Sequence, residues 1–264
     1  MRSNAGWHTS RRSPDLPTLS CRSLGNFFTI RDVIARYAPV ALRFMLLGTQ
    51  YRAAINYTQR ALEEASDRVY YIFQTLADAD AAVAADPDAL ADTPSAPAPA
   101  KGKKPAPPGP AEEAMAAAAT LCDTVVAALE DDLNTPQALA ALSAPLKSVN
   151  DLLTTKQGRK APGRGVALRQ LATAMRAALD MLGLSDGGKP GAELEHLRAA
   201  ALVRAGLKSA DIDAAIARRV AARQAGDYAA GDAIRLELAA KGIALQDGAG
   251  GSMTWRPQVV TDNP

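Results

Sequence analysis

Apolar side chains recur at three- and four-residue steps through much of the chain, which is the spacing of one face of an α-helix. The first long segment with this spacing covers residues 56–85. Its apolar positions are Leu62, Val69, Phe73, Leu76 and Val83. Thr58 stands just before them, and its hydroxyl can accept a hydrogen bond from an otherwise unpaired backbone N–H. The pattern predicts one long helix over 56–85.

A series of further helices is predicted to start near Glu112. The apolar stripe of the first is Leu121, Val125, Leu129 and Leu133. Asn134, Thr135 and Pro136 then end it and begin the next, because a polar cap followed by proline is a typical helix start. The stripe of that next helix is Leu139, Leu142, Leu146 and Val149. Pro145 lies inside it and predicts a kink.

A third helix of this series is predicted between Gly163 and Gly183. Its stripe is Leu168, Leu171, Met175, Leu179 and Leu182. Residues 86–110, by contrast, are rich in Pro, Ala and Lys, and proline at that density removes backbone donors and blocks helix. Helices this apolar on one face need partners. We therefore expect residues 56–185 to form an antiparallel helical bundle with an insertion at 86–110.

The last stretch, residues 186–264, predicts two shorter helices. Ser209 is the expected cap of the first, and Asp211 and Asp213 lie in its first turn, where the helix dipole favours carboxylates. Asp227 is the expected cap of the second.

Two short strands are predicted after these helices. Residues 243–245 and 253–255 are the candidates, and the acidic and glycine-rich residues 247–251 between them are typical of a hairpin turn. The expected fold class is therefore mainly α: an antiparallel helical bundle followed by a small α+β domain.

Composition narrows the function classes. The 264 residues carry a formal net charge of +2, which excludes a generic polyelectrolyte binder, so any nucleic-acid binding must come from local placement of Arg and Lys. The chain is 48% apolar, which excludes wholesale disorder. No apolar run approaches the roughly 20 residues of a membrane helix, so no membrane partner is expected.

Cysteine and histidine limit the chemistry further. Cys21 and Cys122 are the only cysteines, and His8 and His196 are the only histidines. This set offers neither the four closely spaced ligands of a zinc site nor a disulfide framework, so a reducing, intracellular compartment is expected. Cys122 lies in an apolar helix stripe and is interpreted as a small buried hydrophobe.

Three segments, in the same order, resemble the cysteinyl-tRNA synthetases, which are class I aminoacyl-tRNA synthetases. Residues 23–32 (SLGNFFTIRD) resemble the segment after the KMSKS signature loop of that family. Residues 131–136 (DDLNTP) are similar to a motif of its DALR-type helical bundle. Residues 227–235 (DYAAGDAIR), with 242–243 and 254–256, resemble its C-terminal anticodon-binding domain. Together the three are a far more specific signal than any one motif.

The resemblance implies a division of the chain. Residues 1–18 would be a disordered or transit-like start, since they are rich in Arg and Ser. Residues 19–55 would hold a degenerate KMSKS loop and the stem-contact region. Residues 56–185 would be the DALR-type bundle, and residues 186–264 the anticodon-binding domain.

The resemblance also implies an activity: ATP-dependent activation of cysteine and its attachment to tRNA-Cys. The family's HIGH-type motif and zinc ligands are missing from this sequence, so we expect the catalytic half to be absent. The signature loop is degenerate, because residues 19–23 read LSCRS. Arg22 stands where the family has its second lysine, and Arg22 and Ser23 are the ATP-binding positions that the resemblance implies. Arg22 keeps the charge but changes its reach, and because this sequence has no ATP pocket, the interpretation favoured for this chain alone is a solvated loop residue.

The C-terminal motif implies RNA contacts. By resemblance, Arg223, Tyr228, Asp232 and Asp247 stand at positions that contact anticodon bases. The chemistry suits this, because arginine donates to guanine edges, aspartate accepts from amino groups and an aromatic ring stacks on an unpaired base. From spacing alone, Arg223 and Asp232 are also read as surface charges, Tyr228 as a packing residue and Asp227 as a helix cap.

Several other residues are interpreted as structural or solvent-exposed rather than functional. Trp255 is interpreted as core of the small domain. Arg218, Arg219 and Arg223 lie on neighbouring turns and either meet phosphates or form an ordinary solvated face. Asp131 and Asp132 are interpreted as capping carboxylates rather than a catalytic pair. A further group of basic residues in the insertion is interpreted as a soluble spacer: Lys101, Lys103 and Lys104.

The favoured function is therefore the tRNA-binding C-terminal portion of a cysteinyl-tRNA synthetase, inactive alone and paired with a separately encoded or upstream catalytic half, in the cytoplasm or in a plastid or mitochondrion. Two alternatives stay open: a non-catalytic tRNA-binding protein derived from such an enzyme, and a helical scaffold that binds a protein partner.

Overall fold

The computed structural model describes residues 29–86, 89, 108–185, 190–247 and 253–259. Helices make up most of these ranges. The strands found there, β1 (Ile243–Asp247) and β2 (Met253–Pro257), pair antiparallel with Leu245 opposite Trp255. The predicted fold class, mainly α with a small α+β end, is confirmed.

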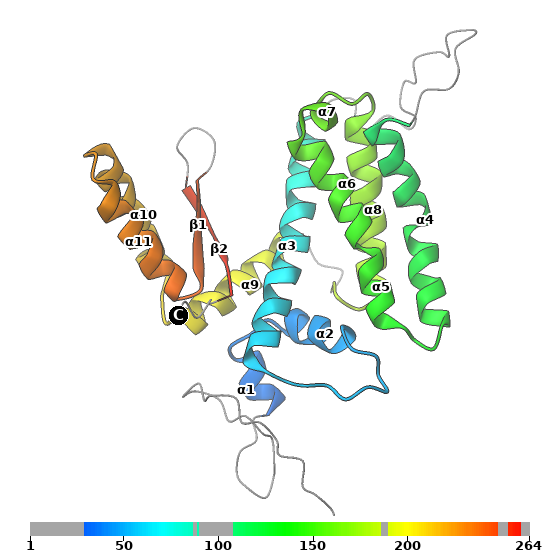
Figure 1. The fold of residues 1–264 in the computed structure, drawn as a ribbon, viewed down its shortest axis with the longest axis horizontal. Coiled ribbons are helices and arrows are strands. Elements are labelled where there is room, and N and C mark those ends of the chain that lie inside the picture. Colours follow the sequence, from blue (N-terminus) through cyan, green and yellow to red (C-terminus); the bar gives the residue numbers. More distant parts are fainter. Residues whose placement is uncertain (1–28, 87–88, 90–107, 186–189, 248–252, 260–264) are drawn as a thin grey trace, which may run out of the picture.

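The described part begins with two short helices that lie across the start of the long helix α3 (Gln59–Ala84) (Figure 1). The first is α1 (Ile30–Ile34). Thr29 caps it reciprocally, since the Asp32 N–H donates to Thr29 Oγ1 and the Thr29 N–H donates to the Asp32 carboxylate. The second, α2 (Pro39–Leu47), begins with proline, which has no N–H to leave unpaired.

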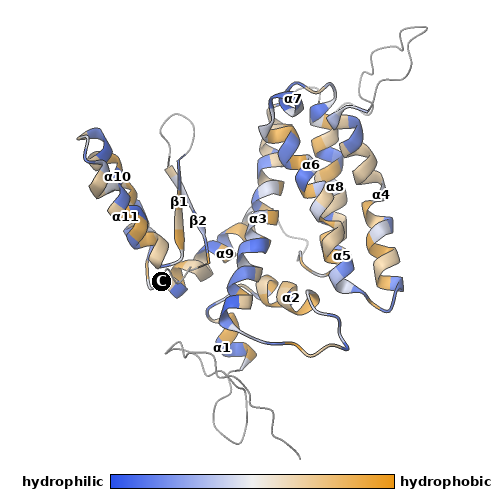
Figure 2. Ribbon diagram, in the orientation of Figure 1, coloured by the Kyte–Doolittle hydropathy of each residue, from blue (hydrophilic) through white to orange (hydrophobic). Residues whose placement is uncertain are grey.

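Four helices of the bundle stand side by side and alternate in direction: α3, α4 (Pro110–Glu130), α6 (Ser143–Thr154) and α8 (Arg164–Met181) (Figure 1). The short helices α5 (Thr135–Ala141) and α7 (Lys156–Arg159) join them. The apolar stripes predicted from the sequence pack in the bundle core, except that Leu133 lies beyond the end of α4 and is 57% exposed. Figure 2 shows apolar residues along all four helices. The largest fully buried side chains of this core are Leu62, Leu76, Leu142, Leu152, Leu168, Leu171, Met175 and Leu179.

Most predicted helix boundaries in the bundle are confirmed, because local hydrogen bonds set them. The Ala61 N–H donates to Thr58 Oγ1 at 3.0 Å, and the Gln137 N–H donates to Asn134 Oδ1 at 3.2 Å. Gly163 precedes α8 with φ 72°, and Gly183 follows it with φ 62°, a left-handed conformation that glycine adopts without a Cβ clash.

The disturbance predicted at Pro145 takes the form of a break between two helices, one turn before the proline. The chain forms two helices, α5 and α6, which meet at Leu142, and Pro145 lies in the first turn of α6. The first four N–H groups of a helix have no partner within it, so the missing proline N–H costs no hydrogen bond there. Pro145 therefore begins a helix instead of bending one.

The second unit consists of α10 (Ser209–Gln224), α11 (Tyr228–Ala240) and the β1–β2 ribbon, around its own small core. The prediction that Ser209 caps α10 is wrong. Ser209 is the first helical residue, and the backbone N–H of Lys208 before it donates to Asp211 at 2.8 Å. The buried apolar residues of this core are Ala201, Ile212, Ala215, Leu238, Ile243 and Leu245.

Helix α9 (Pro190–Ala205) connects the two units. Leu194 and Leu197 in its first half pack in the bundle core, whereas Ala201 near its end packs in the second core. The guanidinium of Arg198, between them, lies 5.7 Å from the ring centres of both Tyr70 on α3 and Trp255 on β2. A single helix and a stacked arginine therefore hold the C-terminal unit against α3.

None of the helices in the described ranges has the length and apolar character that a membrane span requires.

The bundle core yields a stability prediction. We expect Leu171→Ala to lower the free energy of unfolding by about 2–5 kcal/mol, because Leu171 is fully buried and its removal leaves a cavity. Val126→Ala on α4 is the matched control, since Val126 is 41% exposed, and should cost well under half of that. Urea denaturation monitored by circular dichroism measures both variants. Equal losses would show that the stripe of α8 is not the packed face.

Candidate nucleic-acid interface

The turn between α10 and α11 positions the candidate site. Gly226 has φ 77°, which lets the chain reverse direction within residues 225–227. The Ala230 N–H donates to Asp227 Oδ1 at 2.9 Å, so the interpretation of Asp227 as a helix cap is confirmed. As a result the last turn of α10 lies beside the first turns of α11.

Arg219 on α10 is buried, and it is the structural centre of this site. Its side chain is only 4% exposed. Its Nη1 donates to Asp247 Oδ1 at 2.8 Å and lies 3.3 Å from the Met253 sulfur, and its Nη2 donates to Asp247 Oδ2 at 3.5 Å. The arginine thus ties α10 to the end of β1. Arg219 therefore belongs neither to a phosphate-facing surface nor to a solvated face, so both predictions made for the arginines of α10 are wrong for this residue.

Arg223 lies one helical turn further along α10 and shares the same carboxylate. Its Nη1 donates to Asp247 Oδ1 at 3.3 Å. The hydrogen bonds from Arg219, and the positive charges of both arginines, hold the pKa of Asp247 below its ordinary value. Unlike Arg219, Arg223 is 46% exposed, so part of its guanidinium is open to a ligand.

Tyr228 and Asp232 share one face of α11, since they are four residues apart. Tyr228 is 65% exposed, and Asp232 is also exposed. Gly231, on the same face, is buried against α10: a Cβ added there would lie 3.4 Å from Arg223 Cγ. Arg223 therefore passes over Gly231, which lies one helical turn after Tyr228 and directly before Asp232 in the sequence. The structure brings the four sequence-predicted residues to adjoining elements, and each of them is solvent-exposed.

The arrangement has chemistry suited to unpaired bases. It combines an open aromatic ring, a guanidinium and carboxylates, which are the groups that stack on bases and hydrogen bond to their edges. Trp255, in contrast, is partly buried and packs on the second core, in line with its interpretation as a core residue. It also stacks on Arg198, which the sequence did not indicate.

The ATP-binding positions implied by the resemblance, Arg22 and Ser23, lie outside the described residues, as do Cys21 and the lysines of the insertion, Lys101, Lys103 and Lys104. Within the described ranges, no group of three or more His, Cys, Asp or Glu residues is placed to hold a metal ion. These residues therefore do not fit the zinc of the family.

A second polar cluster was missed by sequence reasoning. Asp131 ends α4 as a capping position, but Asp132 makes tertiary contacts. The Tyr51 hydroxyl donates to Asp132 Oδ1 at 2.9 Å, and Arg52 Nη2 lies 3.3 Å from the same oxygen. Asp132 has φ 50°, which is left-handed, and the backbone carbonyl accepts from Gln50 Nε2 at 2.9 Å. This cluster joins the loop after α2 to the α4–α5 turn.

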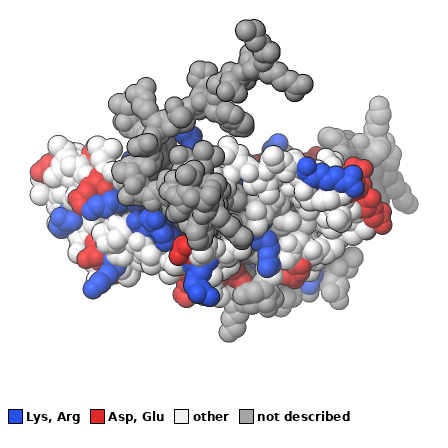
Figure 3. Space-filling model, turned by 90° about the horizontal axis from the view of Figure 1, so that it is seen from below, with Lys and Arg blue, Asp and Glu red and all other residues white. Residues whose placement is uncertain are grey.

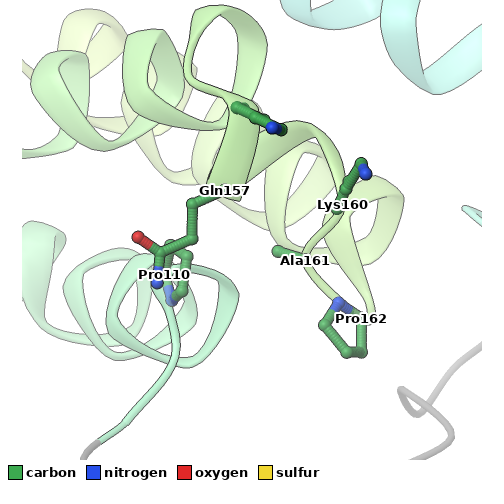
Figure 4. A pocket seen from close by; sticks show the side chains of 6 residues that line it. Pro110, Gln157, Lys160, Ala161 and Pro162 are labelled. Atoms are coloured by element: carbon green, nitrogen blue, oxygen red, sulfur yellow. The ribbon is translucent and has the colours of Figure 1, made fainter.

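A hollow of about 500 Å³ lies at the end of the bundle between α4 and α7 (Figure 4). Pro110, Gln157, Lys160, Ala161 and Pro162 line it, together with Lys156. The two lysines are exposed, and no carboxylate, hydroxyl or thiol lines the hollow beside them to form an acid–base pair or to activate an amine. Catalysis is therefore not assigned to this hollow.

Charge is spread rather than concentrated on the face that Figure 3 shows, where Lys and Arg side chains lie mostly beside Asp and Glu. The formal net charge of +2 likewise provides no broad basic surface for a nucleic acid. This face therefore shows no broad basic field, and the best-formed group of polar side chains near the α10–α11 turn is Arg219, Arg223 and Asp247.

Comparison with known proteins shows which family this chain is similar to. Residues 18–67 match the model of the tRNA synthetases class I (C) catalytic domain, and residues 124–185 match the DALR domain. The chloroplastic/mitochondrial cysteine–tRNA ligase of Arabidopsis thaliana is 42% identical over 238 residues, which are 90% of this chain and 39% of that relative. The cysteine–tRNA ligase of Anaeromyxobacter sp. (strain K) is 37% identical over 235 residues, 89% of this chain and 43% of that relative.

The chain spans about two fifths of the length of the curated relatives it matches. Two family models match successive parts of this chain, and the similarity to the cysteine–tRNA ligases extends over nearly all of it. The chain therefore belongs to the cysteine–tRNA ligase family and carries the portion of it that contains the DALR domain.

Proposed function

We propose that the C-terminal unit binds the anticodon loop of tRNA-Cys, and that it serves the ATP-dependent attachment of cysteine to that tRNA. The observation that carries the proposal is the exposed ring of Tyr228 on α11, the helix that packs against α10, from which Arg223 pairs with Asp247. Stacking and paired hydrogen bonds to base edges are the means by which proteins read single-stranded RNA loops. The relatives named cysteine–tRNA ligases support the choice of tRNA-Cys as the partner.

Each residue has a proposed role. Tyr228 stacks on an unpaired base, Arg223 donates to a base edge and Asp232 accepts from a base amino group. Asp247 lines the same surface and accepts from Arg223. The bundle presents this unit on α9, whose first half belongs to the bundle core. The relatives named chloroplastic/mitochondrial lead us to propose an organelle or the cytoplasm as its compartment.

For the chemical step, we propose that this chain alone does not activate cysteine and relies on a catalytic half supplied upstream or separately. The support is that the described residues hold no metal-ligating group, and that the signature-loop positions, Arg22 and Ser23, are degenerate in sequence. ATP and zinc chemistry are therefore not assigned to any described residue of this chain.

The catalytic proposal has a direct test. We expect the purified chain to give no cysteine-dependent exchange of pyrophosphate into ATP, because it lacks the sequence motifs that hold ATP and the thiolate of cysteine in the family. A full-length relative assayed in parallel is the positive control. Exchange above the level without cysteine would contradict the proposal and place the missing functions within this chain.

The RNA-binding role of Tyr228 is tested by truncation. We expect Tyr228→Ala to weaken binding of a tRNA-Cys transcript by about 1–3 kcal/mol, or about 5- to 150-fold, because a base loses its stacking surface. Filter binding or fluorescence anisotropy at fixed salt concentration measures the loss.

Leu236→Ala is the matched control for Tyr228→Ala. Leu236 is on the same helix and 70% exposed, but lies two turns away from Tyr228, so its truncation should leave tRNA affinity unchanged. Equal affinity of the Tyr228→Ala variant and the parent chain would remove Tyr228 from the interface. A parent chain with no preference for the GCA anticodon would instead favour the protein-scaffold alternative.

The Asp247 carboxylate predicts a pH dependence of stability. Its pKa is lowered in the folded protein, chiefly by the hydrogen bonds from Arg219. A lowered folded pKa means that the charged carboxylate stabilises the fold above the unfolded value of about 3.9, and that this stabilisation is lost as pH falls through the lower folded value. We expect the stability difference between the parent chain and Asp247→Asn to be largest near neutral pH and to shrink in acid.

Urea unfolding at neutral and acid pH measures that difference. In a Trp7→Phe background, the fluorescence of Trp255 reports on the C-terminal unit. Asp232→Asn is the control, since the described residues provide no ion pair for Asp232, and it should change stability little at either pH. A difference for Asp247→Asn that stayed constant with pH would show that the carboxylate is not held by the arginines.

A further inference from the structure

Arg219 is an unusual residue for the core of so small a unit. It follows Ile212 and Ala215 on the face of α10 that packs into the second core, and its side chain is 4% exposed. Its Nε is buried, with no hydrogen-bond partner among the described residues. Its charge is met by one carboxylate, that of Asp247, which is itself 55% exposed.

Stability alone does not account for this arginine. Moving a guanidinium out of water is costly, and replacing a buried ion pair by apolar side chains of similar volume is often neutral or stabilising. Here the replacement would be easier still, because Asp247 is exposed and would remain hydrated after Arg219 was removed. The contacts of Arg219 therefore point to a role other than stability.

What Arg219 touches is the carboxylate that holds Arg223. Asp247 Oδ1 accepts from Nη1 of both arginines, at 2.8 Å from Arg219 and 3.3 Å from Arg223. Arg219 also donates to Oδ2, so it fixes the carboxylate at both oxygens. The Asp247 side chain therefore cannot turn away to solvent without losing its bonds to a buried partner.

Arg223 is in turn held at two points. Its Cγ lies against Gly231, and its Nη1 is bonded to Asp247. Its Nε and Nη2 have no hydrogen-bond partner among the described residues. This is the edge of the guanidinium that makes paired hydrogen bonds to a base or a phosphate. Arginine loses much side-chain freedom when a ligand fixes it, so an arginine fixed in advance binds at a lower entropic cost.

We propose that Arg219 is a positioning residue for RNA recognition: its buried guanidinium fixes the Asp247 carboxylate, which presents the Nε–Nη2 edge of Arg223 to an RNA base. This inference rests on the proposed anticodon-binding function. Asp247 then acts mainly through Arg223, and the specificity of the site depends on a residue that touches no RNA.

Arg219→Met tests the proposal with two separate measurements on the full chain. Methionine keeps the length and apolar character of the side chain but removes the guanidinium. We expect its urea midpoint to match or exceed that of the parent chain. We expect its affinity for a GCA-anticodon tRNA transcript to fall about tenfold, and its preference over a transcript with a changed anticodon to fall with it. Arg219→Lys, which can still hold one carboxylate oxygen, should recover part of the affinity and part of the anticodon preference.

A double-mutant cycle shows whether the effect passes through Arg223. Arg219→Met should cost little further affinity once Arg223→Met is present, because the guanidinium that it positions is already gone. Arg60→Met is the charge-matched control: Arg60 is exposed on α3, a helix of the bundle, and is paired with Glu64, so its loss should leave anticodon preference unchanged.

Each other result decides against the proposal. Unchanged affinity and anticodon preference in Arg219→Met would overturn it, and so would additive losses in the cycle. Should Arg219→Met not fold, Arg219→Lys provides the test through the same cycle with Arg223→Met. A parent chain without any anticodon preference would overturn the proposed function as well, whereas preference retained in Arg219→Met overturns the positioning role alone.

Discussion

The arrangement of this protein depends on a single helix that belongs to two cores. The first half of α9 contributes Leu194 and Leu197 to the bundle, and Ala201 near its end contributes to the C-terminal unit. Arg198 lies between these halves and stacks against Tyr70 and Trp255. Arg256 on β2 adds an ion pair to Asp67 on α3, with the charged atoms 3.8 Å apart. The orientation of the C-terminal unit, which carries Arg223 and Asp247, is therefore set by aromatic and charged contacts on α3 and not by a flexible connection.

Features fixed by local chemistry could be predicted from the sequence. Thr58, Asn134 and Asp227 cap helices because each satisfies a backbone N–H three residues ahead, a relation that needs no knowledge of the rest of the fold. The apolar stripes identified the bundle because their three- and four-residue spacing is also a local property of the sequence. Where two local signals competed, prediction was off by a residue: Ser209 looked like the cap, but Asp211 satisfies the backbone N–H of Lys208 instead.

Features fixed by tertiary contacts could not be predicted. The arginines at 218, 219 and 223 looked alike along the helix, yet only the fold shows that Arg219 faces the core while Arg223 is half-exposed. Asp132 looked like a local capping residue, and its contacts to Tyr51 and Arg52 cross about 80 residues of sequence. The four candidate RNA-binding residues came from resemblance to a family, and the structure adds how two of them are held: Asp247 and Arg223 are joined through a carboxylate that Arg223 shares with Arg219.

That shared carboxylate connects the modest charge of the chain to its proposed selectivity. A protein with a net charge of +2 cannot rely on a broad basic field, so the salt-dependent, sequence-independent part of its RNA affinity should be small. Its affinity must then come from contacts that are made well, and a flexible arginine makes a weaker contact than one already in place. A buried arginine is a costly way to hold a surface arginine still. It is nonetheless effective in a core of few residues, because a single guanidinium can bind a carboxylate at both oxygens and fill apolar space with its methylene groups.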